Sequence, residues 1–404
     1  MTDRILLLEN IDPGARAYLA DLGFKVDMEK SAFDEAQLDE ALPNYQALGI
    51  RSKTHLSREL LSRHPHLKAV GAFCIGTNQI HLVEANKQGI AVFNAPYSNT
   101  RSVAELVLAE MVALSRQLGE VNSAAHRGEW LKSAKGSREV RGKTLGIVGY
   151  GHIGSQVSIL AEALGLRVLF YDIVKKLPLG NARAVGSVDE LLRESDFVTL
   201  HVPETPVTQN MMDAARLQSM RKGAFLINAS RGTVVDIPAL TGALKSGHIA
   251  GAAVDVFPEE PQSNNEKFIS ELQGMKNVIL TPHIGGSTEE AQEAIGREVA
   301  IALGTFLTTG ASPGAVNFPQ LSVPQKSPDD TSLRLINVHR NVPGVLSAVN
   351  GIVSKAQANI KAQYLATDSN IGYLVMDIEL DNPGEVYQEV AKLPTSIKTR
   401  LIGT

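Results

Sequence analysis

A glycine-rich turn between an apolar run and an amphipathic segment is the feature that most constrains how this 404-residue chain folds. The run "KTLGIVG" leads into "YGHIGSQVSILAEALG", which places Gly149, Gly151 and Gly154 in the pattern G-x-G-x-x-G. Glycines suit such a turn because the backbone must bend sharply, let a pyrophosphate approach, and pack the following helix on the strand. The start of that helix offers free N–H groups and a partial positive charge to phosphates. The motif therefore predicts a strand, a turn and a helix that bind a dinucleotide.

An aspartate at the end of the next apolar run indicates which dinucleotide is bound. Asp172 ends the run "RVLFYD". A carboxylate there can accept hydrogen bonds from both ribose hydroxyls and would repel a 2′-phosphate, so NAD is favoured over NADP. Lys175 and Lys176 follow closely and keep NADP as the alternative.

Short apolar runs alternate with amphipathic segments through two stretches of the chain. Residues 4–10, 45–51, 67–76 and 90–96 read as strands of a parallel sheet with helical crossovers. A long helical pattern starts at Asn99. Six further strand-like runs lie at 143–149, 167–172, 196–202, 224–230, 250–257 and 277–283. This order predicts an α/β fold with a doubly wound nucleotide-binding sheet.

The C-terminal part of the chain has a different organisation. A capping box from Ser287 to Glu290 predicts the start of another long helix. Four prolines among small and polar residues between 309 and 328 indicate a linker. Residues 331–404 then alternate as strand, helix, strand, strand, helix, strand, which is the ferredoxin-like order, with Pro343 suited to the first turn of the first helix.

Three polar side chains follow three successive strands of the predicted nucleotide-binding sheet: Arg231, Glu260 and His283. Parallel neighbours lie about 4.8 Å apart, so these residues should meet over the crevice where such sheets bind ligands. Histidine can exchange a proton at neutral pH, and a carboxylate on its other ring nitrogen would fix its tautomer. Arginine suits a carboxylate or a carbonyl oxygen. The set predicts acid–base chemistry beside a dinucleotide.

Other classes of protein fit the sequence less well. The chain has no nucleophile elbow G-x-S-x-G and no histidine pair with zinc-site spacing, so a serine hydrolase and a metal-dependent alcohol dehydrogenase are disfavoured. The formal net charge of −4 offers no broad attraction to nucleic acid or to an anionic membrane. The single cysteine, Cys74, cannot form an intramolecular disulfide. No apolar run is long enough to cross a bilayer, and we expect a cytoplasmic protein.

The motifs "GYGHIGSQ", "NASRGTVVDIPAL", "DVFPEEP" and "LTPHIGGSTEEAQ" resemble the D-isomer-specific 2-hydroxyacid dehydrogenases, and the likeness extends along nearly the whole chain. The resemblance implies that His283 is the general acid and base, that Glu260 tunes it, and that Arg231 holds the substrate. It implies a Rossmann-like NAD domain at 99–285, a discontinuous flavodoxin-like substrate domain at 1–98 and 286–327, and a regulatory domain at 328–404. It also implies further cofactor contacts at His152, Ile153, Ala229, Asp255, Gly285 and Gly286, with Asp255 bound to the nicotinamide carboxamide.

The same resemblance suggests a phosphorylated 2-hydroxy acid, D-3-phosphoglycerate, as the substrate. Arg51 and Lys53 end a first-domain strand, and they and Lys132 match basic residues that face the substrate phosphate in members of this kind. The backbone at Ile75 and Gly76 would receive the substrate carboxylate. A solvated surface that binds no substrate would also explain these three cations.

The last segment resembles an ACT domain, a ferredoxin-like module that binds amino acids between paired copies. Residues that match His339, Asn341 and Asn359 hold L-serine in similar bacterial enzymes, which implies feedback control. Arg340 and Val342 stand where that pattern has a glutamate and an arginine, so the effector could be another amino acid. The domain and the long helix from Asn99 suggest a homodimer or a dimer of dimers.

Two alternatives to this reading stay open. A reductase of glyoxylate, hydroxypyruvate or 2-oxoglutarate would use the same His283, Glu260 and Arg231. A non-catalytic regulator that senses NAD, similar to the corepressors of this superfamily, belongs to a different class. Turnover assays with each acid separate the enzyme alternatives, and NADH production from D-3-phosphoglycerate by the wild type and by His283→Ala is the most informative single experiment.

Overall fold

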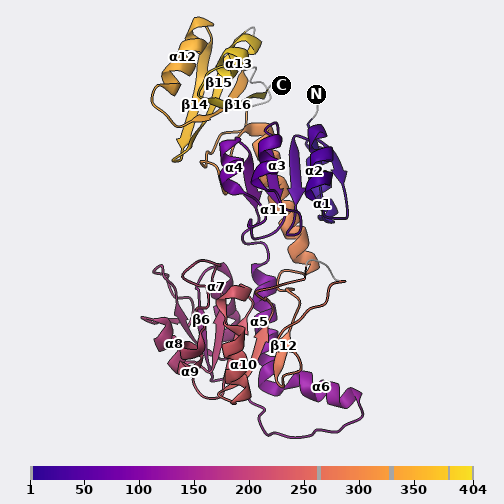
Figure 1. The fold of residues 1–404 in the computed structure, drawn as a ribbon. Coiled ribbons are helices and arrows are strands. Elements are labelled where there is room, and N and C mark those ends of the chain that lie inside the picture. Colours follow the sequence, from indigo (N-terminus) through magenta and orange to yellow (C-terminus); the bar gives the residue numbers. More distant parts are fainter. Residues whose placement is uncertain (1–2, 262–264, 327–331, 381–382, 403–404) are drawn as a thin grey trace. The chain divides into compact units, whose positions relative to one another are not determined.

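The computed structural model describes residues 3–261, 265–326, 332–380 and 383–402. Its internal contacts divide the chain into two units, Met1–Ser98 with Gln292–Thr404, and Asn99–Ala291 (Figure 1). Within the described ranges, no helix is both long and apolar enough to span a membrane.

The first unit begins with a five-stranded parallel sheet in the order β2-β1-β3-β4-β5, which is the flavodoxin-like order. Apart from the edge strand β2, the strands are nearly continuous apolar runs because helices cover both faces of the sheet. The strands are β1 Arg4–Leu7, β2 Lys25–Met28, β3 Ala47–Ile50, β4 Ala69–Ala72 and β5 Ala91–Asn94. The helices are α1 Pro13–Asp21, α2 Glu35–Ala41, the 3-10 turn Leu42–Asn44, α3 Arg58–Arg63, α4 Leu82–Lys87 and α11 Glu289–Thr309.

Two local expectations for this unit were wrong. The sequence pattern did not predict β2, because "KVDM" is short, alternates weakly and lies at the edge of the sheet. The helix α11 is capped by Thr288, whose hydroxyl accepts a hydrogen bond from the Ala291 N–H, and not by Ser287. A one-residue shift of this kind is usual where two hydroxyl residues stand together.

The proline-rich segment after α11 is fixed on the sheet where it is described. Ala315 pairs with Phe93 at the edge strand β5, and the Asn317 side chain bonds the backbone of Ile90 and Val92. Phe318 and Leu321 are buried between the prolines. The part of the predicted linker up to residue 326 is therefore anchored, and residues 327 and 328 lie outside the described ranges.

The C-terminal part of the same unit is a four-stranded antiparallel sheet in the order β14-β15-β13-β16, with both helices on one face. This is the predicted ferredoxin-like arrangement. Its elements are β13 Leu333–Arg340, α12 Val345–Lys355, β14 Asn359–Thr367, β15 Ile371–Glu379, α13 Pro383–Ala391 and β16 Ser396–Ile402. The helix α12 starts after Gly344, whose φ is +89°, so Pro343 lies just outside the first turn where it was expected.

The free face of the antiparallel sheet packs against the end of α11 in one apolar core. Tyr373 packs against both Phe306 and Phe318, with ring centroids 6.1 and 5.5 Å away, and its hydroxyl donates to the Gly310 carbonyl at 2.6 Å. Arg400 stacks on Phe306 and donates to its carbonyl at 2.8 Å. The two sheets of this unit are thus joined by side chains as well as by the chain.

The second unit is a seven-stranded parallel sheet in the order β12-β11-β10-β9-β6-β7-β8. The order reverses between β6 and β9, as in Rossmann-like folds, and this confirms the predicted fold class. The strands are β6 Thr144–Val148, β7 Arg167–Tyr171, β8 Arg183–Ala184, β9 Phe197–Leu200, β10 Ala224–Asn228, β11 Ile249–Val254 and β12 Val278–Leu280. The pattern did not predict β8, which is a two-residue exposed edge.

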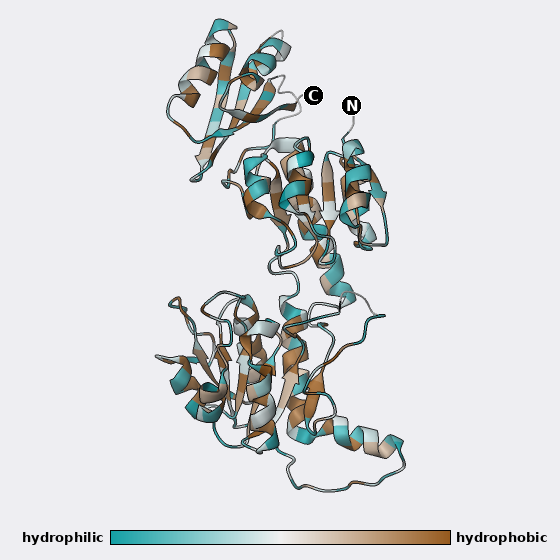
Figure 2. Ribbon diagram, in the orientation of Figure 1, coloured by the Kyte–Doolittle hydropathy of each residue, from teal (hydrophilic) through white to brown (hydrophobic). Residues whose placement is uncertain are grey.

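Helices cover both faces of this sheet. In Figure 2 the hydrophobic strands are brown, and the helices that cover them carry hydrophilic residues, in teal, on their outer side. The helices of this unit are α5 Thr100–Arg116, α6 Leu118–His126, α7 His152–Ala163, α8 Val188–Glu194, α9 Ala214–Ser219, the 3-10 turn Gly232–Val234 and α10 Ile237–Lys245, of which α6 extends away from the sheet (Figure 1). The helix from Asn99 ends at Arg116 because Gln117 adopts a left-handed conformation with φ +53°.

Candidate active site

The structure shows why each of three positions in the turn after β6 is a glycine. Gly149 has φ +94°, and a Cβ there would lie 2.2 Å from the His201 carbonyl oxygen. A Cβ on Gly154 would lie 2.1 Å from the Gly149 carbonyl oxygen, so this glycine lets α7 pack on the turn. Nothing lies within 4 Å of a Cβ on Gly151, which caps α7. The helix start at His152 and Ile153 is thus open to a phosphate, and the residues fit a dinucleotide.

Asp172 is held at the tip of β7, beside the glycine turn. One carboxylate oxygen accepts the Tyr150 N–H at 2.8 Å, and the other accepts the Val174 N–H at 2.9 Å. Asp172 is partly exposed. A fixed carboxylate at this position disfavours a 2′-phosphate, in agreement with the preference for NAD.

The pair formed by His283 and Glu260 is the centre of the site. His283 Nδ1 lies 2.8 Å from Glu260 Oε2, and Glu260 Oε1 accepts the Phe257 N–H at 3.0 Å. Because Nδ1 is engaged, Nε2 is the ring nitrogen left for a substrate proton. The loops after β11 and β12 therefore bring together an acid and an imidazole that are separate in the sequence.

The charges around this pair shift both pKa values. The hydrogen bond with Glu260 raises the pKa of His283 above its ordinary value, and this outweighs the opposite effects of burial and of Arg231. Burial acts to raise the pKa of Glu260, but the bonds from His283 and from the Phe257 N–H, with the charges of His283 and Arg231, leave it below its ordinary value. The pair is thus biased towards an imidazolium and a carboxylate.

Arg231 lies close enough to act on both members of the pair, and the backbone explains how it is placed. Asn228, at the end of β10, donates to the Arg231 carbonyl at 3.0 Å, and its side-chain oxygen accepts the Ser230 N–H. A Cβ on Gly232 would lie 1.9 Å from the Phe257 carbonyl carbon, so the loops after β10 and β11 are in backbone contact. The structure therefore brings the three predicted residues into one site.

Asp255 fixes the loop that carries His283. It is only 1% exposed, and its carboxylate accepts the Thr281 hydroxyl at 2.6 Å, the Ile284 N–H at 2.8 Å and the Gly285 N–H at 2.9 Å. The Asp255 carbonyl also accepts the His283 N–H at 2.8 Å. His283 has φ +53°, an uncommon conformation for a residue with a side chain, and such strain persists only where the surroundings impose it. The expected contact of Asp255 with the nicotinamide carboxamide stays a prediction.

The remaining predicted cofactor residues lie in the same part of the unit. Ala229 follows β10 and is partly buried between Asn228 and Ser230. A Cβ on Gly285 would lie 3.1 Å from Asp255 Oδ2, and one on Gly286 would lie 2.8 Å from Asn99 Nδ2. Both glycines thus belong to the loop that Asp255 holds.

Two ionisable residues in this unit were not predicted: Glu110, which is 3% exposed, and His201, which is half-buried. Burial raises the pKa of Glu110 to about 8, and the Asp255 carboxylate adds to the shift while Thr281 opposes it. Burial lowers the pKa of His201, behind Gly149, to about 3. The signal for Glu110 was available, because this glutamate interrupts the apolar stripe of α5 formed by Val103, Val107, Met111 and Leu114.

The predicted substrate residues of the first unit lie at the carboxyl ends of two adjacent strands. Arg51 and Lys53 follow β3, and Ile75 and Gly76 follow β4. Asn94 donates to the Ile75 carbonyl at 2.5 Å. Lys132 belongs to the second unit and is exposed in the segment after α6, next to Trp130, which is 87% exposed. The segment carrying Lys132 extends away from the sheet of its own unit (Figure 1).

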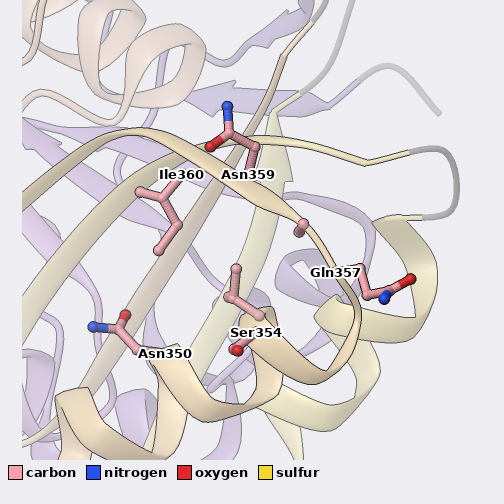
Figure 3. Close-up of a pocket in the computed structure, with 7 residues that line it drawn as sticks. Asn350, Ser354, Gln357, Asn359 and Ile360 are labelled. Carbon is pink, nitrogen blue, oxygen red and sulfur yellow. The ribbon is translucent and has the colours of Figure 1, made fainter.

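The predicted effector residues are separated within one chain. His339 pairs with Gly372 and Asn359 with Glu379 along the same strand β15, so they occupy opposite ends of the sheet, roughly 24 Å apart at about 3.4 Å per residue. Asn341 follows β13 and donates to the Asp368 carbonyl at 2.7 Å. Asn359 lines an open pocket with Asn350, Ser354 and Gln357 (Figure 3). His339 is buried, with Nδ1 beside the Arg340 carbonyl.

Comparison with known proteins adds to this geometry. The family model described as D-isomer specific 2-hydroxyacid dehydrogenase, NAD binding domain, matches residues 108–285, and the one described as AHAS small subunit-like ACT domain matches residues 335–398. The chain is 51% identical to D-3-phosphoglycerate dehydrogenase of Haemophilus influenzae over 400 residues, 99% of this chain and 97% of that one. It is also 51% identical to D-3-phosphoglycerate dehydrogenase of Escherichia coli K12 over 402 residues, with the same coverage.

A solved structure supports the fold. The D-lactate dehydrogenase of Aquifex aeolicus, complexed with NAD and lactic acid, superposes with a TM-score of 0.67 at 30% identity, and the match covers 78% of this chain and all of that one. The superposition leaves 22% of this chain (100% − 78%) without a counterpart, which is the size of one small domain.

Proposed function

Because the chain belongs to the D-isomer-specific 2-hydroxyacid dehydrogenase family, we propose that it oxidises D-3-phosphoglycerate to 3-phosphohydroxypyruvate, the first step of serine biosynthesis. It is an NAD-dependent oxidoreductase. The observation that supports this function most directly is the His283–Glu260 pair, 2.8 Å apart beside Arg231, in the unit that carries the glycine turn.

The residues of the second unit suggest how the oxidation proceeds. NAD, when bound, supplies the acceptor for the hydride of the substrate C2. Neutral His283 takes the C2 hydroxyl proton at Nε2, and Glu260 stabilises the imidazolium that forms. Arg231 holds the substrate through its carboxylate or the developing carbonyl oxygen. Holding both reactants in one orientation removes much of the entropic barrier to their encounter.

Within this proposal, the first unit selects the substrate. Arg51 and Lys53 bind the phosphate, with Lys132 as a further cation, and the backbone at Ile75 and Gly76 binds the carboxylate. The support is that the loops after β3 and β4 are neighbours at the sheet edge where α/β folds bind ligands. The domain division at 1–98 with 286–327, 99–285 and 328–404 is part of the same proposal.

An amino-acid effector fits the ACT domain, and we propose L-serine. Because His339 and Asn341 lie at one end of the sheet and Asn359 at the other, one chain cannot join them around a small ligand. A second copy paired antiparallel along the edge strand β14 would bring Asn359 of one copy towards His339 and Asn341 of the other. The effector proposal therefore includes a homodimer or a dimer of dimers. A cytoplasmic location completes the proposal.

The test is NADH production from D-3-phosphoglycerate by the wild type and by His283→Ala, with D-2-hydroxyglutarate, D-glycerate and glycolate as competing substrates. We expect the highest kcat/KM with D-3-phosphoglycerate and a loss of about 10³-fold or more in the variant. Equal rates in the two proteins would remove His283 from the mechanism. A higher kcat/KM with another acid would replace the substrate, and NAD binding without turnover of any acid would favour a regulator.

A further inference from the structure

A buried carboxylate organises the loop that carries two of the proposed phosphate-binding cations. Glu9 follows β1 and is 7% exposed. Its Oε1 accepts the N–H groups of Arg51 at 3.0 Å and Thr54 at 2.9 Å, and its Oε2 accepts the Lys53 N–H at 3.0 Å. One side chain thus satisfies three backbone donors of the loop at residues 51–54.

These contacts occupy a position that would otherwise attract an anion. Nearby backbone N–H groups that converge form a concave site for negative charge. Here Glu9 fills that site from within the protein, with charge-assisted hydrogen bonds that are stronger than neutral ones. A substrate phosphate near this loop is therefore left to the side chains of Arg51 and Lys53, since the amides of residues 51, 53 and 54 are already engaged.

The backbone at Glu9 is itself constrained. Glu9 has φ +63° and the following Asn10 has φ +52°, and two consecutive non-glycine residues in the left-handed region are uncommon. The Glu9 N–H donates to the Ser31 carbonyl and the Asn10 N–H to the Glu29 carbonyl, which holds them in this conformation. Strain of this kind is found mainly where the surroundings fix a functional geometry.

The loop is also held from its other side. Gln79, which is 8% exposed, donates to the Arg51 carbonyl at 2.6 Å. The same amide contacts Cys74 Sγ at 3.3 Å, next to the carbonyl of Ile75 that Asn94 holds. The backbone at 51–54 is fixed by two buried side chains, whereas the Lys53 side chain is exposed and that of Arg51 partly so.

We propose that Glu9 is a positioning residue for the substrate phosphate: by binding the amides of Arg51, Lys53 and Thr54, it sets the direction in which the two cations leave the loop. This inference rests on the proposed function, because it takes Arg51 and Lys53 as the phosphate ligands. In this proposal Glu9 acts through the loop, because its carboxylate is engaged by the three backbone amides.

The variant Glu9→Gln tests the inference with little change in volume. Glutamine keeps one oxygen for Arg51 and Thr54, but its NH₂ group opposes the Lys53 N–H. We expect KM for D-3-phosphoglycerate to rise about tenfold, with kcat within about twofold of the wild type, because the Lys53 N–H loses its acceptor and the loop that carries both cations is held less firmly. The Kd for NAD and the kcat/KM for the dephosphorylated substrate, D-glycerate, should not change. Glu9→Asp, which keeps the charge, should recover part of the affinity.

Glu84→Gln is the matched control. Glu84 is 6% exposed in the same part of the chain, but it contacts Ser62 on α3 and Gln88, the C-cap of α4, and not the loop at 51–54. It should reproduce any general loss of stability without the change in KM. Thermal unfolding of both variants shows whether they are folded at the assay temperature, and the comparison of two substrates in one protein preparation is independent of the folded fraction.

The double variant Arg51→Ala/Lys53→Ala separates the two levels of the proposal. It should lower the preference for D-3-phosphoglycerate over D-glycerate, and adding Glu9→Gln to it should then have no further effect on KM. If the double variant leaves the preference unchanged, the phosphate assignment fails and the role of Glu9 fails with it. If the double variant lowers it but Glu9→Gln changes KM for both substrates equally, or acts equally in the double variant, the role of Glu9 alone is overturned.

Discussion

At the scale of single residues, the His283–Glu260 pair should set the pH dependence of catalysis. Oxidation requires neutral His283, whose pKa is raised mainly by Glu260, so kcat/KM should rise with pH to a midpoint above the ordinary histidine value. Reduction requires the imidazolium and should fall over the same range. Glu260→Gln removes the charge, so both midpoints should move to lower pH and the rate should fall about 10–100-fold. Rate profiles in both directions measure this, and an unchanged midpoint would contradict it.

Glu110 should make the stability of the second unit depend on pH. Its pKa is about 8 in the folded protein because of burial, against an ordinary value near 4.5. The folded state therefore keeps a proton that the unfolded chain releases, and this contribution is complete below about pH 4.5 and is lost as pH rises through 8. The groups of neighbouring elements that act on it are Asp255 and Thr281.

The variant Glu110→Gln stays neutral at every pH, so it should remove this dependence. Urea unfolding at pH 5.5 and 8.5 measures it: we expect the wild type to lose on the order of 2–4 kcal/mol that the variant keeps. Glu105→Gln, on the exposed side of the same helix α5, is the control and should behave as the wild type. A wild type with equal stability at both pH values would show that Glu110 is not held protonated.

The residues of the site differ in how far the sequence could predict them. Arg231, Glu260 and His283 follow strands, and the carboxyl edge of a parallel sheet is a known place for ligands. Glu9 and Asp255 act through contacts with backbone amides of distant segments, and no spacing in the sequence specifies such contacts. For the same reason, the left-handed conformation of His283 became evident only from the structure.

At the scale of elements, the buried ion pair between Arg334 and Asp377 should hold the antiparallel sheet on the rest of the first unit. Arg334 is 2% exposed and binds both oxygens of Asp377, at 2.7 and 2.8 Å. Its remaining donors reach the carbonyls of Thr309 at 2.9 Å, in the last turn of α11, and of Pro324 at 3.1 Å. One guanidinium thus ties β13 and β15 to α11 and to the segment after it.

Arg334→Met should destabilise this unit by about 3–5 kcal/mol, because it leaves a buried carboxylate without its partner. The double change Arg334→Met/Asp377→Leu should recover part of the loss, since it removes both charges. Denaturant unfolding followed by tyrosine fluorescence is the measurement. Lys392→Met, which breaks an exposed pair with Glu389, should cost less than about 0.5 kcal/mol. A cost as small for Arg334→Met would contradict a role as an anchor.

The elements that were not predicted from the sequence are those whose own residues show no clear apolar pattern. The interior strands were predicted because both faces are buried and the runs are continuously apolar. The strands β2 and β8 lie at sheet edges and are stabilised by one neighbour each. The proline-rich segment was interpreted as a linker from its composition, but Phe318 and Leu321 carry it into the core.

At the scale of the whole molecule, the two sheets of the first unit share an apolar core, so a deletion of the C-terminal domain affects stability as well as regulation. Deleting residues 329–404 should abolish inhibition by L-serine without abolishing catalysis. It would also uncover Phe306 and Phe318, which are 2% and 6% exposed in the intact chain, so the truncated protein should melt at a lower temperature. Undiminished inhibition of the truncated protein would count against the effector assignment.

Point variants test the effector site without this loss. Asn341 and Asn359 are exposed, so Asn341→Ala and Asn359→Ala should each remove inhibition by L-serine with little change in stability. If the site forms between copies, a mixed dimer of the two variants contains one site with both asparagines and one with neither. Co-expression of the two variants under different tags, with purification through both tags, should then restore about half of the serine binding measured by calorimetry. A site within one chain would give no recovery, because each chain lacks one of its asparagines.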